Sequence, residues 1–154
     1  GRRADGSAGE GGLGVAALAM WSWLKAYLLY IWGGLHRYFG NANGVHREYL
    51  RAVHYFNLAY KTDPGFHRAL VASAVIRYRE LGEIEGAIAA LSDLLQAVPD
   101  HGEARFNRAL AYQEAGRYGE ALADFRSYLQ QAQPGDAYYD EARRMVVLLG
   151  ELAE

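Results

Sequence analysis

Small and aromatic residues recur along the chain at a period of 34 to 35 residues. One set of four residues is followed 34 residues later by its counterpart: Tyr78, Gly82, Ala87 and Leu91 precede Tyr112, Gly116, Ala121 and Phe125. Ala52 and Phe56 extend the pattern 35 residues upstream, and Pro64, Pro99 and Pro134 are spaced at 35. Self-similarity at this period predicts supersecondary units that bury their apolar faces only by stacking on one another.

Between these repeated positions the apolar residues follow helical spacing, and no alternating strand pattern occurs. We predict helices over residues 13–39, 45–62, 66–81, 84–98, 103–115, 118–131 and 137–153. Gly40 to Gly44 is a cluster of turn-forming residues that predicts a tight connection. Gly82 and Gly116 are placed to end helices in left-handed geometry. The predicted fold is therefore all-α.

The segment from Glu103 to Pro134 resembles a tetratricopeptide repeat (TPR), with the residues of that family's pattern in order: Ala109, Tyr112, Gly116, Tyr118, Ala121, Phe125 and Pro134. The segment from Arg68 to Pro99 matches nearly as well. The resemblance implies a TPR-like helical-hairpin solenoid over residues 45–154, with two full repeats, a partial first repeat and a polar C-terminal capping helix. Its close crossings would lie at Ala87 and Ala121, where a bulky side chain would hold paired helices apart.

In the TPR family the first helices of successive repeats line a concave groove that receives a peptide or a helix of a partner. Carried onto this chain, the groove residues are Ala72, Ile76, Arg79, Phe106, Asn107, Leu110 and Gln113, with Ala69, Glu80 and Glu114 beside them. Asn107 falls where the family often has an asparagine that bonds the ligand backbone. Phe106 stands where binders of chaperone tails carry a lysine for the terminal carboxylate, which disfavours that ligand class.

Two interpretations of this groove stay open at the level of sequence. Arginines flank the apolar positions at Arg68, Arg79, Arg105 and Arg108, and such a groove would suit an amphipathic partner segment with acidic edges. Alternatively, Phe106 and Leu110 are simply covered by the neighbouring helix.

The first repeat departs from the pattern in its first half. Its second helix is recognisable from Tyr49 to Ala59, but the preceding segment contains Gly33, Gly34 and Gly40. Either the last turns of the helix that begins at Leu13 replace the missing first helix, or some other surface covers the apolar face.

Residues 13–35 form a long apolar stretch with one charge, Lys25, and are long enough to span a bilayer. Lys25 lies near the middle, where a charge is costly. The aromatic residues lie in the centre and C-terminal half instead of at both membrane interfaces: Trp21, Trp23, Tyr27, Tyr30 and Trp32. We predict that they anchor the protein or bury it in an assembly. The helix spans a bilayer, packs against protein including copies of itself, or lies in the interface; residues 1–12 are predicted to form a flexible Gly-rich tail.

Composition narrows the chemistry. With 16 basic and 18 acidic residues the formal charge is −2, which provides no field for nucleic acid, and the absence of cysteine removes disulfides and thiolate sites. The five histidines contain no i, i+4 pair, so no metal site is expected. No nucleophile, phosphate loop or triad spacing is visible. We therefore expect no enzyme activity, no cofactor and no small-molecule substrate.

Together these patterns predict a protein-interaction scaffold held in a membrane or a larger complex by its N-terminal helix. The alternative is a self-assembling structural subunit, a homo-oligomer or filament with that helix buried between protomers. Arginines precede the apolar stretch at Arg2 and Arg3 and follow it at Arg37, Arg47 and Arg51, so the side of the membrane stays open.

Overall fold

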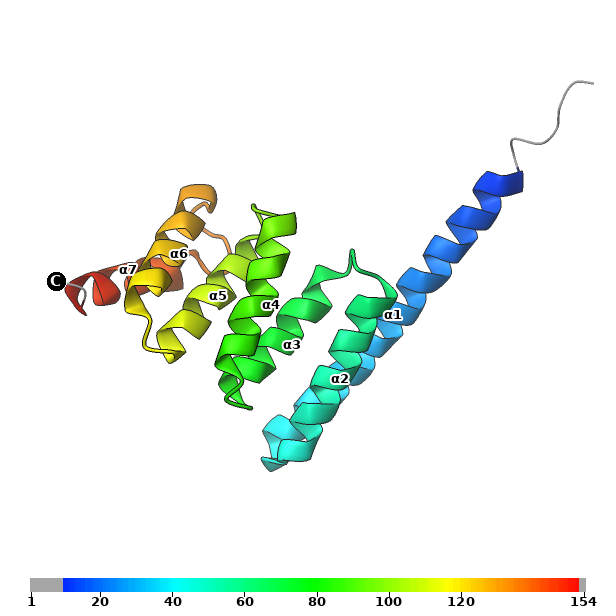
Figure 1. The fold of residues 1–154 in the computed structure, drawn as a ribbon, viewed down its shortest axis with the longest axis horizontal. Coiled ribbons are helices and arrows are strands. Elements are labelled where there is room, and N and C mark those ends of the chain that lie inside the picture. The colour runs from blue at the N-terminus through cyan, green and yellow to red at the C-terminus, as the bar shows by residue number, and fades with distance from the viewer. Residues whose placement is uncertain (1–9, 153–154) are drawn as a thin grey trace, which may run out of the picture.

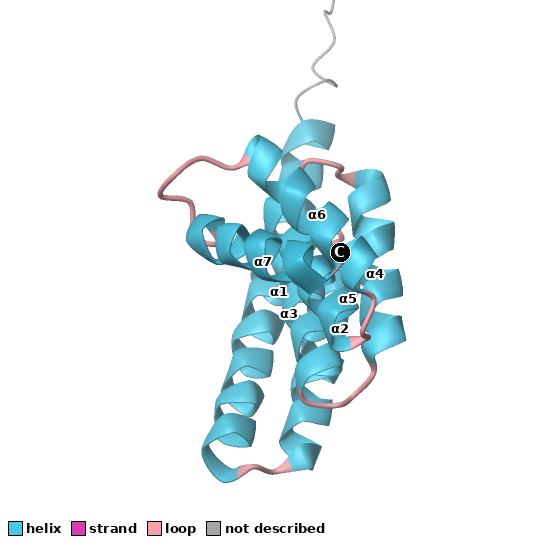
Figure 2. Ribbon diagram, turned by 90° about the vertical axis from the view of Figure 1, so that its left-hand side faces the viewer, coloured by secondary structure: helices cyan, strands magenta, loops and turns pink. Residues whose placement is uncertain are grey.

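A computed structural model describes residues 10–152 of the chain. This part consists of seven helices: α1 (Glu10–Asn43), α2 (His46–Thr62), α3 (His67–Arg79), α4 (Ile84–Ala97), α5 (Gly102–Glu114), α6 (Tyr118–Gln131) and α7 (Tyr139–Leu152). Figure 2 shows these helices joined by short loops, and the described part contains no strand. The all-α prediction is confirmed, while most of the predicted flexible tail, residues 1–9, lies outside the described residues.

The helices form consecutive antiparallel hairpins that stack in chain order (Figure 1). The pairs are α1 with α2, α3 with α4, and α5 with α6, and α7 packs on α6 as the last element. The first helices also meet across hairpins, since α3 contacts α5. One face of the stack is therefore made by first helices, as the resemblance implies.

Glycines with positive φ close the turns of the second and third hairpins. Gly82 has a φ of 69° and Gly116 a φ of 72°, which L side chains rarely adopt. The left-handed residue lets the following N–H turn back onto the helix, and Glu83 N–H donates to the Arg77 carbonyl at 2.8 Å. The repeated glycines in the sequence therefore mark the positions where the first helices of successive hairpins end.

The core lies along the helix crossings in three clusters, and the clusters of the second and third hairpins share residues. Ala87 and Ala121 are fully buried at the crossings, beside Leu91 and Phe125. Leu110 packs against both the cluster shared by α3, α4 and α5 and the cluster shared by α5, α6 and α7. Each hairpin therefore buries its apolar face only because the next one is present.

The first hairpin corrects our interpretation of its glycines. α1 does not break at Gly40 but continues to Asn43, and only Gly44, with a φ of 63°, forms the turn. A Cβ at Gly33 would lie 2.8 Å from the Phe56 ring, and one at Gly40 would lie 2.9 Å from the Tyr49 ring. The two glycines are seven residues apart and so are the two rings, as two antiparallel helices in close contact require. The second half of α1 is the missing helix of the first repeat.

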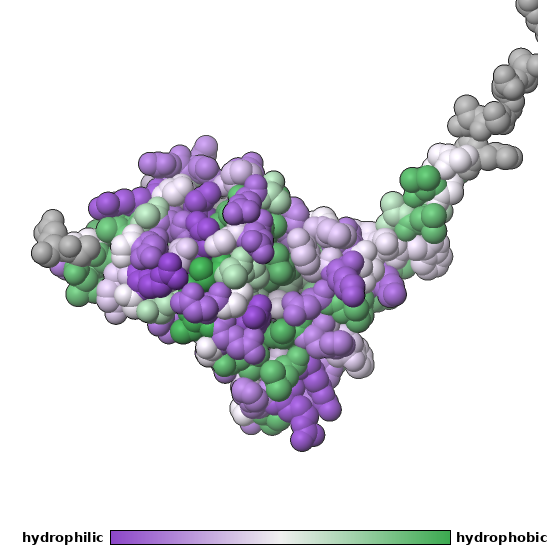
Figure 3. All heavy atoms as spheres, in the orientation of Figure 1, coloured by the Kyte–Doolittle hydropathy of each residue, from purple (hydrophilic) through white to green (hydrophobic). Residues whose placement is uncertain are grey.

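The first half of α1 extends past its hairpin partner. Ser22 Oγ lies 3.5 Å from the Thr62 carbonyl at the end of α2, and residues 10–21 project beyond that level (Figure 1). Apolar residues colour the projecting end in Figure 3, and Leu13, Leu18 and Trp21 are exposed. By length and composition α1 is a candidate membrane span from Gly11 to Asn43, within which an 18-residue window has a mean hydropathy of 1.3. The stretch predicted over 13–39 is thus one helix with two structural roles.

The capping helix is less polar than predicted. Val147, Leu148 and Leu152 of α7 are exposed at the C-terminal end of the stack. Ala142 and Leu149 of the same helix are buried and pack with residues of α5 and α6. The solenoid therefore ends in apolar surface at both of its described ends.

Candidate partner-binding groove

A hollow of about 440 Å³ lies on the face made by the first helices. Four helices and one loop contribute to its wall: α1 gives Tyr30 and Arg37, α3 gives Arg68, Val71, Ala72, Val75 and Arg79, α5 gives Glu103, Phe106, Asn107 and Leu110, the loop before α7 gives Tyr138, and α7 gives Glu141. We call this hollow the groove. It exists because successive hairpins turn the same helix face toward a shared concave side.

Most of the predicted groove residues meet there. Ala72, Arg79, Phe106, Asn107 and Leu110 all line the groove. The remaining two lie elsewhere: Ile76 lines an adjoining hollow of about 200 Å³ that it shares with Arg37 and Arg79, and Gln113 lines a separate hollow with Tyr118 and Leu148 near the end of α7. One turn of helix therefore separates the groove from Gln113.

Phe106 forms part of the floor of the groove. Its ring stacks on Tyr138 of the loop before α7 at a centroid distance of 4.4 Å and meets Phe125 edge to face at 5.6 Å. Only 2% of the residue is exposed. Phe106 is therefore covered by neighbouring side chains, as the second interpretation of the groove expected. Leu110 is only half-buried.

Asn107 is held in position by two hydrogen bonds. Its side-chain Nδ2 donates to the Glu103 carbonyl at 2.9 Å, and its Oδ1 accepts from the Tyr78 hydroxyl at 3.3 Å. Burial raises the pKa of Tyr78 to about 12, so the hydroxyl keeps the proton that it donates. An amide nitrogen has two hydrogens, and the second one on Nδ2 is left for a ligand carbonyl.

The groove carries more positive than negative charge. Arg37, Arg68 and Arg79 face Glu103 and Glu141, and in the described part of the chain no arginine of the three has a carboxylate within 4 Å. Arg37 comes from α1 and Arg68 and Arg79 from α3, so the three arginines border the apolar floor from the α1 and α3 side, whereas Glu103 and Glu141 come from α5 and α7. An acidic ligand would gain charge-assisted hydrogen bonds without displacing an existing ion pair.

Two of the arginines expected beside the groove lie elsewhere. Arg108 forms a bidentate pair with Asp124, Nε at 2.7 Å and Nη2 at 2.8 Å, and its Nη1 donates to Ser92 of α4. Arg105 donates to the Pro99 carbonyl at 2.7 Å. The hydrogen bond to Asp124 raises the pKa of Arg108. Both side chains leave α5 on the side that meets α4 and α6, so they join hairpins and do not flank the groove.

The sequence interpretation missed the contribution of α1. Tyr30 and Arg37 were not predicted in the groove, because Tyr30 was assigned to an anchor or assembly surface and the role of the last turns of this helix in the first repeat was left open. The repeat itself held the signal, since Arg37 lies 35 residues before Ala72, which in turn lies 34 residues before Phe106. This spacing is informative only once α1 is recognised as the first helix of the first repeat.

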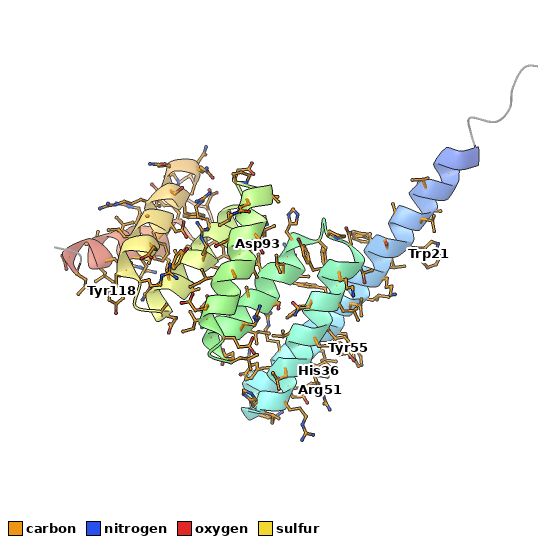
Figure 4. All side chains as sticks on the ribbon, viewed as in Figure 1. Trp21, His36, Arg51, Tyr55, Asp93 and Tyr118 are labelled. Atoms are coloured by element: carbon orange, nitrogen blue, oxygen red, sulfur yellow. The ribbon has the colours of Figure 1, made fainter. Side chains whose placement is uncertain are left out.

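The predicted anchor residues divide into two groups. Trp21, Trp23 and Trp32 are exposed, and Tyr27 stacks on Trp23 at 5.5 Å. Figure 4 shows Trp21 on the projecting part of α1 and Tyr55 on the same outer side of the first hairpin. Tyr30 differs, because it packs against Phe56 and Phe66 at 5.3 and 5.2 Å and belongs to the groove.

A further hollow, of about 490 Å³, lies on this outer side of the first hairpin. Trp32, His36 and Tyr55 line it, and His36 stacks on Tyr55 at 5.3 Å. His36 Nδ1 lies 2.6 Å from Glu48 Oε2, a hydrogen bond that lowers the pKa of Glu48. Among residues 10–152 no group of three His, Cys, Asp or Glu side chains is placed to hold a metal ion. The groove differs from this hollow because residues of successive hairpins line it, whereas only the first hairpin lines the hollow at Tyr55.

Helical hairpins that stack at a fixed period and line one hollow with their first helices define a solenoid of the class that binds other proteins. Residues 73–137 match the family model described as tetratricopeptide repeat. The resemblance seen in the sequence is confirmed.

Solved structures agree with this fold. The first TPR of Spaghetti (RPAP3), described as bound to the HSP90 peptide SRMEEVD, superposes with a TM-score of 0.69 at 20% identity, over 85% of this chain and 95% of that one. The TPR domain of Arabidopsis OM64 gives 0.63 at 20% identity, over 82% and 98%. No curated protein sequence matches the chain. At this identity the two structures show the shared fold.

Proposed function

We propose that the protein is an interaction scaffold whose groove holds an acidic, amphipathic segment of a partner protein, while α1 attaches the solenoid to a membrane or to a larger assembly. The observation that carries the groove proposal is an apolar floor surrounded by Arg37, Arg68 and Arg79 without carboxylate partners. An amphipathic segment satisfies both features, since its apolar side chains cover the floor and its carboxylates reach the arginines.

The groove favours an internal segment over a chain terminus. A terminal carboxylate needs a cation at the floor, but Phe106 occupies that position and is packed under Tyr138. The available cations lie on the rim, where Arg37, Arg68 and Arg79 are exposed. The free N–H of Asn107 supplies a contact to a ligand carbonyl between them. The HSP90 peptide in the structure of Spaghetti supports a peptide as the class of occupant.

Selection from a displayed peptide library on the immobilised full chain tests the proposal. We expect the selected peptides to combine acidic with apolar residues and to bind at least tenfold more weakly to a triple Arg37→Gln, Arg68→Gln, Arg79→Gln variant. Such a loss corresponds to about 1.4 kcal/mol, less than one charge-assisted hydrogen bond. Affinity should also fall as salt is raised.

A matched variant controls for net charge. Arg126, Arg143 and Arg144 are exposed on α6 and α7 and do not line the groove. Their joint change to glutamine removes the same charge, and it should leave the affinity of the selected peptides unchanged. Peptides without acidic residues, or equal losses in the two triple variants, would contradict an acidic occupant of the groove.

A further inference from the structure

The outer face of α1 carries a continuous apolar stripe that nothing in the described chain covers. We call it the α1 stripe, and its members are Trp21, Leu24, Leu28, Ile31, Leu35 and Tyr38. Their exposed fractions range from 37% to 66%. Their spacings alternate between three and four residues, the pattern of a helix that packs along a second helix. The stripe lies on the side of α1 opposite Gly33 and Gly40, which face α2.

A bilayer is a poor partner for this stripe while the first hairpin is folded. Residues 10–21 project freely but rise only about 18 Å, whereas the hydrocarbon core is about 30 Å thick. From Ser22 onward α1 runs beside α2, whose exposed side chains include Arg51 and Lys61. Crossing the membrane would therefore draw the end of α2 and its charges into lipid, at a cost of several kcal/mol.

The same face is covered by protein in the third hairpin. Ala104 of α5 is fully buried against α3 and α4, and Leu35 is its counterpart 69 residues earlier. Leu35 is 40% exposed because no helix precedes α1 in the described chain. The stripe thus continues, at the end of the stack, a surface that elsewhere meets another helical hairpin.

We propose that the α1 stripe packs antiparallel against the α1 stripe of a second copy of this chain. In one register every position of the stripe meets a position of similar kind: Trp21 meets Tyr38, Leu24 meets Leu35, and Leu28 meets Ile31 of the second copy. The contact is symmetric, since each pair occurs twice about a two-fold axis between residues 29 and 30. Residues 16–43 overlap along about 42 Å, which includes the end of the projecting part.

Charge selects the antiparallel arrangement over the parallel one. Lys25 and Arg37 are the only lysine and arginine between residues 11 and 43. Lys25 borders the stripe, so in a parallel pair the two copies of Lys25 would lie at the same level, whereas in the antiparallel register Lys25 lies at the level of Gly34 of the second copy. The opposed helix dipoles add to the same preference. Arg37 stays on the rim of the groove, and α2 covers each outer side of the resulting four-helix arrangement with polar residues.

This inference rests on the attachment role proposed for α1 and names its partner. Sedimentation of the full chain without detergent should give twice the mass of one chain. A double Leu28→Lys, Ile31→Lys variant should sediment as one chain with unchanged helical circular dichroism, because lysines cannot be buried at the centre of the contact between two α1 stripes. The control variant Leu50→Lys, Val147→Lys changes two exposed apolar residues outside the stripe and should stay paired.

The absence of native cysteine makes the orientation directly testable. Leu24→Cys and Leu35→Cys variants, mixed and oxidised, should form a disulfide between unlike chains, and each variant alone should form little. Disulfides between two copies of the same variant would indicate a parallel pair and would overturn the antiparallel register.

Two other outcomes would overturn the pairing itself. The first is a single-chain mass at concentrations suited to sedimentation, and the second is flotation of the chain with phosphatidylcholine and phosphatidylglycerol vesicles without self-association. Binding of the selected peptides is measured on the same variants. The double-lysine variant should keep that binding, so a failure of the pairing is distinguished from a failure of the groove.

Discussion

The first and third hairpins use the same crossing but differ on the face turned toward the start of the chain. In the third hairpin, Arg108 binds Asp124 and Ser92 there, and the contact joins α5 to α4 and α6. In the first hairpin, the residues 69 positions earlier are Phe39 and Tyr55, and no charged pair forms between them. An interior hairpin thus binds its neighbour with charge, while the terminal one presents aromatic and aliphatic surface. The difference leaves exposed apolar surface at this end of the described solenoid, which is the surface that the proposed pairing of α1 would cover.

The crossing of the first hairpin gives the largest expected effect. Gly33→Leu should destabilise the protein by about 3 kcal/mol, because the side chain starts 2.8 Å from the Phe56 ring and 3.2 Å from the Ala52 carbonyl. Gly34→Leu is the matched control, since a Cβ there meets nothing within 4 Å and leucine favours a helix over glycine. Urea midpoints measure both. Equal midpoints would mean that α1 is not pressed against α2.

The charged contact of the third hairpin comes next. Asp124→Ala should cost about 2 to 3 kcal/mol, because it leaves the half-buried Arg108 without its carboxylate and removes the neighbour of Arg105 at 3.6 Å. Glu120→Ala removes an exposed partner of Arg117 and should be close to neutral. The two variants lie on the same helix, so thermal unfolding compares them directly. A small loss of stability for Asp124→Ala would mean that this charged contact does not hold the hairpins together.

The alanines at the repeated crossings follow. Ala87→Leu and Ala121→Leu should each destabilise the solenoid by about 2 kcal/mol, since both residues are fully buried where paired helices meet. Ala89→Leu and Ala123→Leu lie two residues further along and are exposed. These two should be close to neutral. Chemical denaturation with no difference within each pair would contradict the register of the repeats.

The period of the sequence was sufficient to predict these crossings but not the first one. Ala87 and Ala121 repeat at 34 residues, and repetition is visible without a structure. Gly33 and Gly40 do not repeat that pattern, and glycine within a helix usually destabilises it. Only the positions of Phe56 and Tyr49 show that the glycines make room for rings. The spacing of seven from Ala26 to Gly33 to Gly40 was the available signal.

The groove was predictable to the extent that the repeats define faces. Phe106, Asn107 and Leu110 follow from the resemblance and line the groove. The direction of Arg105 and Arg108 did not follow, because it depends on how α5 is rotated against α4 and α6. Whether Phe106 is open or covered depends on Tyr138, which lies in a loop without a repeated pattern. Positions within a period are thus predictable, while contacts with non-repeated segments are not.

The smallest expected effect concerns Tyr78, whose counterpart in the first hairpin is Asn43 at the end of α1. Tyr78→Phe removes the hydroxyl that donates to Asn107 and should cost about 1 kcal/mol near neutral pH. Burial raises the pKa of Tyr78 from 10.0 to about 12. The unfolded chain therefore loses this proton first, so the contribution of Tyr78 is complete below pH 10 and is lost as pH rises toward 12. Guanidinium midpoints should fall more steeply over that window for the unmodified chain than for Tyr78→Phe, and the gap between them should narrow.

Tyr27→Phe, at an exposed position on α1, should leave the midpoint at pH 8 unchanged. Parallel curves for the unmodified chain and Tyr78→Phe from pH 8 to 12 would show that the hydroxyl is not held in a buried bond to Asn107, and the second Nδ2 hydrogen assigned to the ligand would lose its fixed position with it.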